Sequence, residues 1–100
     1  MFEPGRFVAD HIEPVTDTQI QPNGVDLRLG TVFTQIAPGR IGRSGKTVGD
    51  RRELEPEDGV FTLPPGGYIA RYVETVSIPA DHVGFIFPRS SLMRNSCMLN

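Results

Sequence analysis

The sequence has a single cysteine, no long apolar run and little net charge, and each of these absences excludes a class of protein. Cys97 cannot form a disulfide within the chain, which is typical of a reducing, cytoplasmic compartment. No apolar run approaches the roughly 18 residues of a membrane-spanning helix, and the acidic, proline-containing start is unlike a signal peptide, so we expect no membrane partner. A net charge of −2 gives no electrostatic reason to expect a nucleic-acid polymer as partner.

Turn-forming residues, in contrast, are frequent. The 100 residues include 11 glycines and 9 prolines, which favours short strands over long helices. We expect one short helix over residues 7–12, ending before Pro14, because its apolar residues and His11 can share one face. Apart from a helical turn at residues 92–94, the other expected elements are strands. They comprise 20–33, 31–36 (the same or the next strand), 53–55, 59–63, 68–73, 75–78, 83–87 and one beginning at 95. This series predicts a single small domain with an all-β sandwich or barrel.

Two exposed stretches imitate functional motifs. Residues 39–47 end in Gly-Lys-Thr, as a phosphate-binding P-loop does, but Arg40 occupies the place of the first required glycine and no helix is expected to follow. We therefore predict a mobile surface loop over residues 38–50. The second stretch is acidic and has no basic or histidine partner at a fixed spacing, so we interpret it as a solvated charge run; it contains Glu53, Glu55, Glu57 and Asp58.

The segment on which the functional interpretation depends follows an alternating apolar pattern. Residues 83–87 alternate as in a largely buried strand, and Pro88 removes the amide that would continue the ladder. Ser90 and Ser91 are each suited to cap a short helical turn over residues 92–94.

Polar groups converge at this expected turn. Its backbone amides, the hydroxyls of Ser90 and Ser91 and the guanidinium groups of Arg89 and Arg94 together suit a phosphate group. A capped strand end with two solvated arginines is an equally simple interpretation of the same residues.

A second candidate lies in the first strand region. A turn at residues 22–24 is followed by alternation that places aliphatic side chains on one face and Asp26 and Arg28 together on the other. Without further information, this pair is also consistent with a solvated outer face.

Taken together, these motifs resemble those of the dUTPase/dCTP deaminase superfamily. The resemblance rests on Gln-Pro-Asn-Gly-Val-Asp-Leu-Arg-Leu-Gly at residues 21–30, Leu-Pro-Pro-Gly-Gly-Tyr at 63–68, and residues 78–84 with Pro-Arg-Ser-Ser-Leu-Met-Arg at 88–94. The chain is most similar to archaeal-type dUTPases, and the likeness covers nearly its whole length. It implies a distorted jelly-roll β-barrel of the dUTPase type, present only in part, with residues 1–100 as the N-terminal part of one domain. It also implies a homotrimer.

The resemblance further implies hydrolysis of dUTP to dUMP and pyrophosphate, which keeps uracil out of DNA. On the matched positions, Arg89, Ser90, Ser91 and Arg94 would bind the substrate phosphates. Asp26 would hold Mg²⁺ through water, and one aspartate is enough because this ion keeps several waters and takes few carboxylates beside phosphates. The family's catalytic base and base-reading segment would lie downstream of Asn100, so no catalytic base is assigned within this chain.

Two other functions remain open at this stage. One is a dCTP deaminase or a bifunctional deaminase–diphosphatase, whose catalytic glutamate would also lie downstream. The other is a non-catalytic nucleotide-binding module. Asn95 and Ser96 depart from the apolar-glycine pair usual in the family after this arginine, so the turn there is expected to differ.

Overall fold

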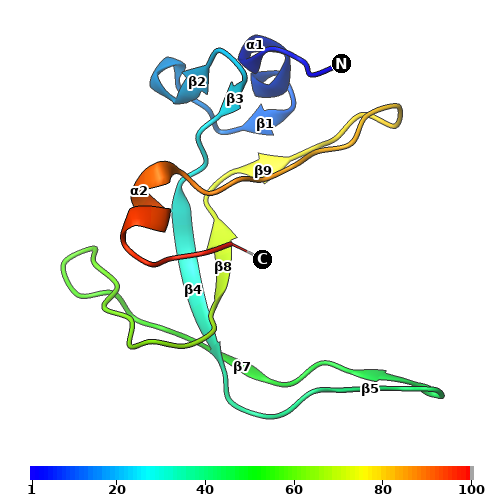
Figure 1. Cartoon of the computed structure of the whole chain (residues 1–100), viewed down its shortest axis with the longest axis vertical. Helices are drawn as coiled ribbons and strands as arrows, with labels where there is room; N and C mark the ends of the chain where they lie inside the picture. The colour runs from blue at the N-terminus through cyan, green and yellow to red at the C-terminus, as the bar shows by residue number, and fades with distance from the viewer. Residues whose placement is uncertain (100) are drawn as a thin grey trace.

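The computed structural model describes residues 1–99, in which strands outnumber helices (Figure 1). The helical elements are short: α1 Gly5–Ala9, the 3-10 turn η1 Asp17–Gln19 and α2 Ser90–Arg94. The strands are β1 Ile12–Glu13, β2 Ile20–Gln21, β3 Gly24–Val25, β4 Leu29–Gln35, β5 Arg40–Gly42, β6 Gly45–Thr47, β7 Arg51–Glu53, β8 Ile69–Tyr72 and β9 Thr75–Val76. They form four separate antiparallel sheets, with no closed barrel within residues 1–99. The prediction of an all-β fold with only part of a barrel is confirmed.

The three-stranded sheet β7–β4–β8 forms the centre of the structure. β4 contains the β-branched and aromatic residues that favour a strand, and it pairs with both neighbours. Val32 and Phe33, on its two opposite faces, are only 2% and 8% exposed. The guanidinium carbons of Arg51 on β7 and Arg71 on β8 lie 4.6 and 5.1 Å from the centre of the Phe33 ring. Two cations therefore help to cover this ring.

The N-terminal helix packs against the β2–β3 hairpin. A Cβ atom at Gly5 would collide with the carbonyl of Gln21, and the Gly5 amide donates a hydrogen bond to the carbonyl of Pro22 at 3.1 Å. Only glycine fits at the start of the helix, because the hairpin turn passes directly over it. The predicted helix therefore exists, but it is displaced: α1 ends at Ala9 and Ile12 begins β1.

Four predicted strands are confirmed to within two residues: those at 31–36, 53–55, 68–73 and 75–78, seen as β4, β7, β8 and β9. The strand predicted at 59–63 is wrong, because the chain there makes a single bridge between Glu57 and Val60. The strand predicted from residue 95 is wrong for 95–99, where Ser96 has a positive φ of 61° and the chain turns. Asn100, the end of that expected strand, lies outside the described residues.

Residues 38–50 contain a hairpin, where we predicted a mobile surface loop. β5 pairs with β6 in the register Arg40–Thr47 and Gly42–Gly45, which leaves a two-residue turn between them. The Gly-Lys-Thr sequence is therefore a strand. A P-loop requires it to begin a helix, so the rejection of that motif is confirmed.

The buried strand predicted at residues 83–87 is also wrong. This segment runs back alongside β9 (Figure 1), but no strand within residues 1–99 pairs with it. Phe85 and Phe87 are 68% and 73% exposed, and their ring centres are 6.1 Å apart. The alternating pattern indicates which side chains would share a face, but the described chain supplies nothing to cover that face.

The described chain is open for its size. Its radius of gyration is 16.2 Å, against about 13 Å expected for a compact domain of this length. Its accessible surface is 8642 Å², against about 5,600 Å² for a compact monomer of this mass. Roughly 3,000 Å² that a compact monomer would bury is thus exposed. None of the helices within residues 1–99 has the length and apolar character needed to cross a membrane.

Candidate functional site

The candidate phosphate-binding segment forms a helix that begins earlier than expected. α2 starts at Ser90, and the extended residue before it is Arg89, with φ −71° and ψ 153°. Neither serine caps the helix, because both already lie within its first turn. The Ser90 hydroxyl instead accepts a hydrogen bond from Nη2 of Arg94 at 3.2 Å, and the Ser91 carbonyl accepts one from Nδ2 of Asn95 at 2.8 Å. Ser90 therefore helps to orient the Arg94 guanidinium.

The first and the last candidate segments meet in space. Nη1 of Arg89 lies 3.6 Å from Oδ2 of Asp26, although 63 positions separate these residues. The same oxygen accepts a hydrogen bond from Nε2 of Gln21 at 3.1 Å. The Arg89 side chain is 72% exposed, so its remaining donors face solvent. A basic group, a carboxylate and two serine hydroxyls are thus available at the start of α2.

The expected charge pair between Asp26 and Arg28 is wrong. The strand region predicted at 20–33 is interrupted at residues 26–28, so the strict alternation that would place the two side chains together is lost. Asp26 turns to Arg89, while Nε of Arg28 donates to Oε2 of Glu74 at 2.7 Å.

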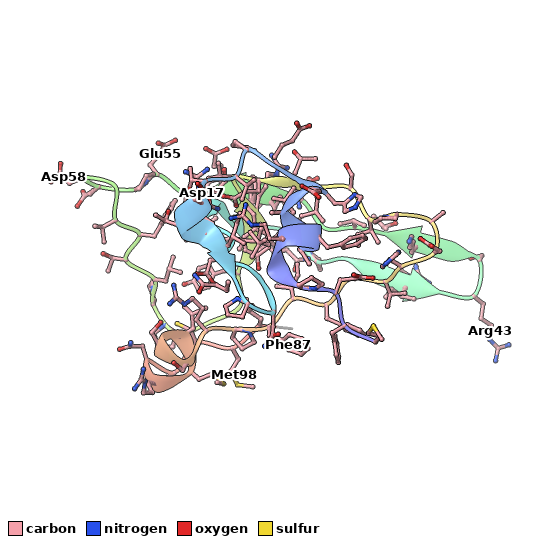
Figure 2. All side chains as sticks on the ribbon, turned by 90° about the horizontal axis from the view of Figure 1, so that it is seen from above. Asp17, Arg43, Glu55, Asp58, Phe87 and Met98 are labelled. Carbon is pink, nitrogen blue, oxygen red and sulfur yellow. The ribbon has the colours of Figure 1, made fainter. Side chains whose placement is uncertain are left out.

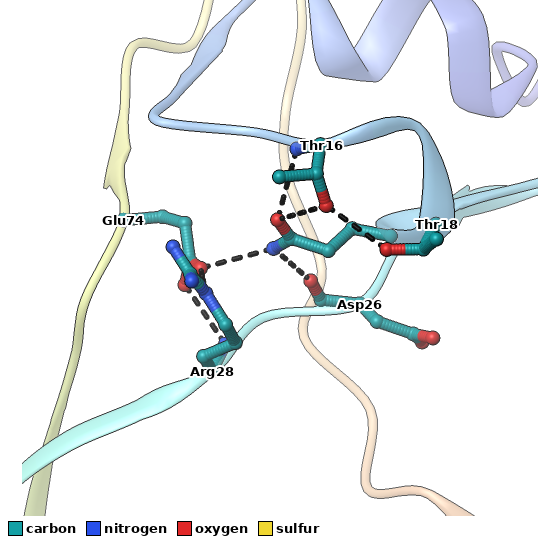
Figure 3. Close-up of polar contacts among 6 residues, drawn as sticks. Thr16, Thr18, Asp26, Arg28 and Glu74 are labelled. Carbon is teal, nitrogen blue, oxygen red and sulfur yellow. Dashed lines mark hydrogen bonds and ion pairs between the residues drawn. The ribbon is translucent and has the colours of Figure 1, made fainter.

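A buried polar network lies beneath Asp26 (Figure 3). Nε2 of Gln19 donates to the carbonyl of Asp26 at 2.9 Å and to Oε2 of Glu74 at 3.0 Å. In return, the Asp26 amide donates to the carbonyl of Gln19 at 2.8 Å. The Arg28 amide donates to the other oxygen of Glu74 at 2.8 Å. Gln19 and Glu74 are each only 7% exposed. These contacts fix the backbone that presents the Asp26 carboxylate.

The sequence analysis missed both Gln19 and Glu74. Gln19 is the last residue of η1, and its side chain reaches back to the start of this turn, where its Oε1 accepts from the amide of Thr16 at 3.0 Å. Glu74 is the one charged residue in a stretch of β-branched and aromatic residues, Tyr-Val-Glu-Thr-Val. A carboxylate in such a stretch needs a buried partner, and that was the available signal.

The environment of Glu74 keeps it ionised. Burial by itself would raise the pKa of this carboxyl, but hydrogen bonds from the side chain and amide of Arg28, from its own backbone and from Gln19 outweigh burial and lower the pKa to about 2. Glu74 is therefore an anchor for Arg28 and Gln19 and is unsuited to accept a proton at neutral pH.

This lowered pKa predicts acid sensitivity. A carboxyl whose pKa falls on folding stabilises the folded state at pH values above its unfolded pKa, here 4.5, and this contribution is lost as the pH falls toward about 2. We expect the free energy of unfolding, measured by urea titration across this window, to fall more steeply for the unmodified chain than for Glu74→Gln. Parallel pH curves for the two proteins would contradict this role.

His82 joins the N-terminus to the turn after β9. Its Nδ1 lies 2.7 Å from Oδ1 of Asp81 and its Nε2 lies 3.3 Å from Oε1 of Glu3, while its ring stacks on Phe7. Both hydrogen bonds raise the pKa of His82, and the bond with Asp81 has the larger effect. A carboxylate at each ring nitrogen therefore favours the protonated form of His82 more than in an isolated histidine, and the contacts tie the N-terminus to this turn.

The ability of the site to hold a metal rests on Asp26. Within residues 1–99, no three histidine, cysteine or acidic side chains gather as a metal-binding group. A single aspartate does not enclose an ion, but it fits Mg²⁺ that is held mainly by water and by phosphate oxygens. The donor set near α2 therefore fits this ion only together with a phosphate ligand.

Comparison with known proteins agrees with these motifs. A family model described as dCTP deaminase-like matches residues 6–100. A Halobacterium salinarum protein named probable deoxyuridine 5′-triphosphate nucleotidohydrolase is 58% identical over 106 residues, which cover 100% of this chain and 64% of that protein. Two further relatives carry the same name. The Aeropyrum pernix protein is 46% identical over 80% of this chain and 50% of that protein. The Methanopyrus kandleri protein is 35% identical over 91% of this chain and 61% of that protein. The chain thus spans about half to just under two thirds of these relatives. No solved structure matches.

Proposed function

Because the chain belongs to the dCTP deaminase-like family, we propose that it provides the triphosphate-binding part of a dUTP diphosphatase, which hydrolyses dUTP to dUMP and pyrophosphate. The observation that carries the proposal is the meeting of Asp26 and Arg89 at the start of α2. Two segments far apart in the sequence place a carboxylate and a guanidinium beside Ser90, which is the arrangement that a hydrated cation and a phosphate chain require. The names of the relatives support dUTP as the substrate.

In this proposal each residue of the site has a defined role. Arg89 and Arg94 donate to phosphate oxygens, Ser90 orients Arg94, and Ser91 adds a hydroxyl donor. Asp26 accepts hydrogen bonds from water bound to Mg²⁺, and the ion would neutralise charge on the triphosphate. The contact between Arg89 and Asp26 is long, at 3.6 Å, and largely exposed, so a phosphate can recruit Arg89 at little cost.

Two alternatives follow from other observations. The description of the matching family favours a dCTP deaminase equally well. A nucleotide-binding module without turnover is favoured by the carboxylates near the site: Glu74 is held ionised by its hydrogen bonds, and Asp26 is paired with Arg89. Both alternatives use the same phosphate contacts and differ from the main proposal in the product.

A chimera separates these functions. This chain would replace the matching 64% of the Halobacterium salinarum relative, and the products formed from dUTP and from dCTP with Mg²⁺ would be separated by chromatography. We expect dUMP and pyrophosphate from dUTP, and no product from dCTP. Deamination of dCTP would overturn the proposal in favour of the deaminase. Tight dUTP binding without turnover would favour the binding module.

The proposal includes the assembly and its setting. We propose a homotrimer, as the resemblance of the motifs implies. The exposed thiol of Cys97 supports a reducing, cytoplasmic location.

A further inference from the structure

Two turns of opposite charge lie at opposite ends of the molecule. The first, which we call the basic hairpin, comprises residues 40–47 and contains Arg40, Arg43 and Lys46 without any acidic residue. The second, the acidic turn, comprises residues 53–60 and contains Glu53, Glu55, Glu57 and Asp58 without any basic residue. Arg43 and Asp58 mark the two ends in Figure 2, and the two segments also diverge to opposite sides in Figure 1.

Neither set of charges is neutralised within the described chain. The four ion pairs among residues 1–99 involve none of these seven side chains. Each end also exposes apolar side chains: Ile41 and Val48 are 91% and 79% exposed at the basic end, and Val60 is 60% exposed at the acidic end. Exposed apolar side chains next to charged ones are a combination that protein–protein interfaces use.

Both ends are held in shape by two-residue turns. β5 and β6 pair on either side of Arg43 and Ser44. In the acidic turn, Glu57 and Val60 exchange two backbone hydrogen bonds of 2.9 Å around a pair of residues with positive φ. Preformed turns lose little entropy on binding. Every residue of the two strands of the basic hairpin is exposed, so a partner surface would add the packing that this hairpin lacks.

We propose that the basic hairpin of one copy docks on the acidic turn of the next copy. This inference deepens the assembly part of the proposed function by naming its contact. The two surfaces differ and lie at opposite ends, so the contact is head-to-tail, and repeated contacts of this kind close into a ring when the rotation permits. Charge complementarity sets the register, and Ile41 and Val60 supply apolar contact.

Charge reversal at each end tests the contact. Arg43→Glu with Lys46→Glu reverses the basic hairpin, and Glu55→Lys with Glu57→Lys reverses the acidic turn; all four residues are exposed. At about 50 mM salt, we expect each double variant to raise the dissociation constant of self-association, measured by sedimentation equilibrium, at least about tenfold. The quadruple variant is expected to return to within about threefold of the unmodified chain, because its charges are again complementary. Arg6→Glu, an exposed reversal on α1, is the control.

The quadruple variant makes the test decisive. Recovery of assembly shows that the double variants fold, since a misfolded end would not be repaired by a change at the other end. A quadruple variant that stays dissociated overturns the proposal, and so do double variants that assemble as well as Arg6→Glu. If the unmodified chain binds single-stranded DNA in a titration and the Arg43→Glu, Lys46→Glu variant loses this binding but assembles normally, the proposal is overturned in favour of a polyanion site on the hairpin. Formation of dUMP by the chimera is a separate measurement, so failure of the substrate assignment is distinguishable from failure of this contact.

Discussion

Replacing Arg89 with alanine is expected to weaken dUTP binding at least about tenfold. Hydrogen bonds between charged groups contribute roughly 1.5–3 kcal/mol each, and about 1.4 kcal/mol corresponds to a tenfold change in affinity. Arg89 is 72% exposed and its contact with Asp26 is long, so its removal takes away a phosphate donor without disturbing a packed region. Isothermal titration calorimetry with dUTP and Mg²⁺ measures the effect directly.

The same titration on Ser90→Ala and Lys46→Ala locates the site. Ser90→Ala removes a hydroxyl and also releases the Arg94 guanidinium, so we expect a loss of comparable size. Lys46→Ala removes one positive charge, as Arg89→Ala does, but from β6 rather than from the start of α2, and we expect no change in affinity. Unchanged affinity in Ser90→Ala would remove the phosphate assignment from α2. A loss in Lys46→Ala equal to that in Arg89→Ala would show only a general effect of charge.

Local patterns in the sequence predicted the strands that have partners in this chain. β8 and β9 were predicted because apolar residues between proline-glycine turns are sufficient to define a short strand. The same pattern at residues 83–87 led to a wrong prediction of burial. Alternation indicates which side chains share a face of the strand. Whether that face is buried depends on another segment that covers it, and the local sequence does not specify that segment.

The hairpin at residues 40–47 was missed for the opposite reason. Apart from Ile41, its residues are polar, charged or glycine, so no apolar alternation marks the strands. The pairing follows from backbone hydrogen bonds around the two-residue turn. The displaced N-terminal helix has a third cause. Gly5, a poor helix former in isolation, begins α1 because the β2–β3 turn leaves no room for a side chain there.

The site could be predicted in its exposed part and not in its buried part. Arg89, Ser90 and Asp26 were candidates from short motifs, and the structure brings Asp26 next to Arg89 at the start of α2. Gln19 and Glu74 are 55 positions apart and act through each other, so no spacing rule reveals them. Their contribution is visible only as a network that holds the backbone of Asp26.

Replacing Glu74 with glutamine is therefore expected to lower the free energy of unfolding by about 2 kcal/mol. The carboxylate accepts hydrogen bonds from Gln19 and from both the amide and the side chain of Arg28. An amide group of the same shape keeps one acceptor but turns an NH₂ group toward one of these donors, so at least one buried donor is left unsatisfied, at a cost of about 1–3 kcal/mol. Arg28 is half exposed and regains water, which limits the loss.

Urea unfolding at neutral pH and a single protein concentration measures this change, with Glu13→Gln as the matched control. Glu13 is exposed on β1, in register with the neighbour of Glu74, and its replacement is expected to change stability by less than about 0.5 kcal/mol. If the network positions Asp26, Glu74→Gln also weakens Mg²⁺-dependent dUTP binding under conditions where the variant is still fully folded, whereas Glu13→Gln does not. A variant that loses stability but binds dUTP normally would limit Glu74 to a structural role. Unchanged stability would contradict the network itself, because a buried carboxylate with three donors cannot be neutralised without consequence.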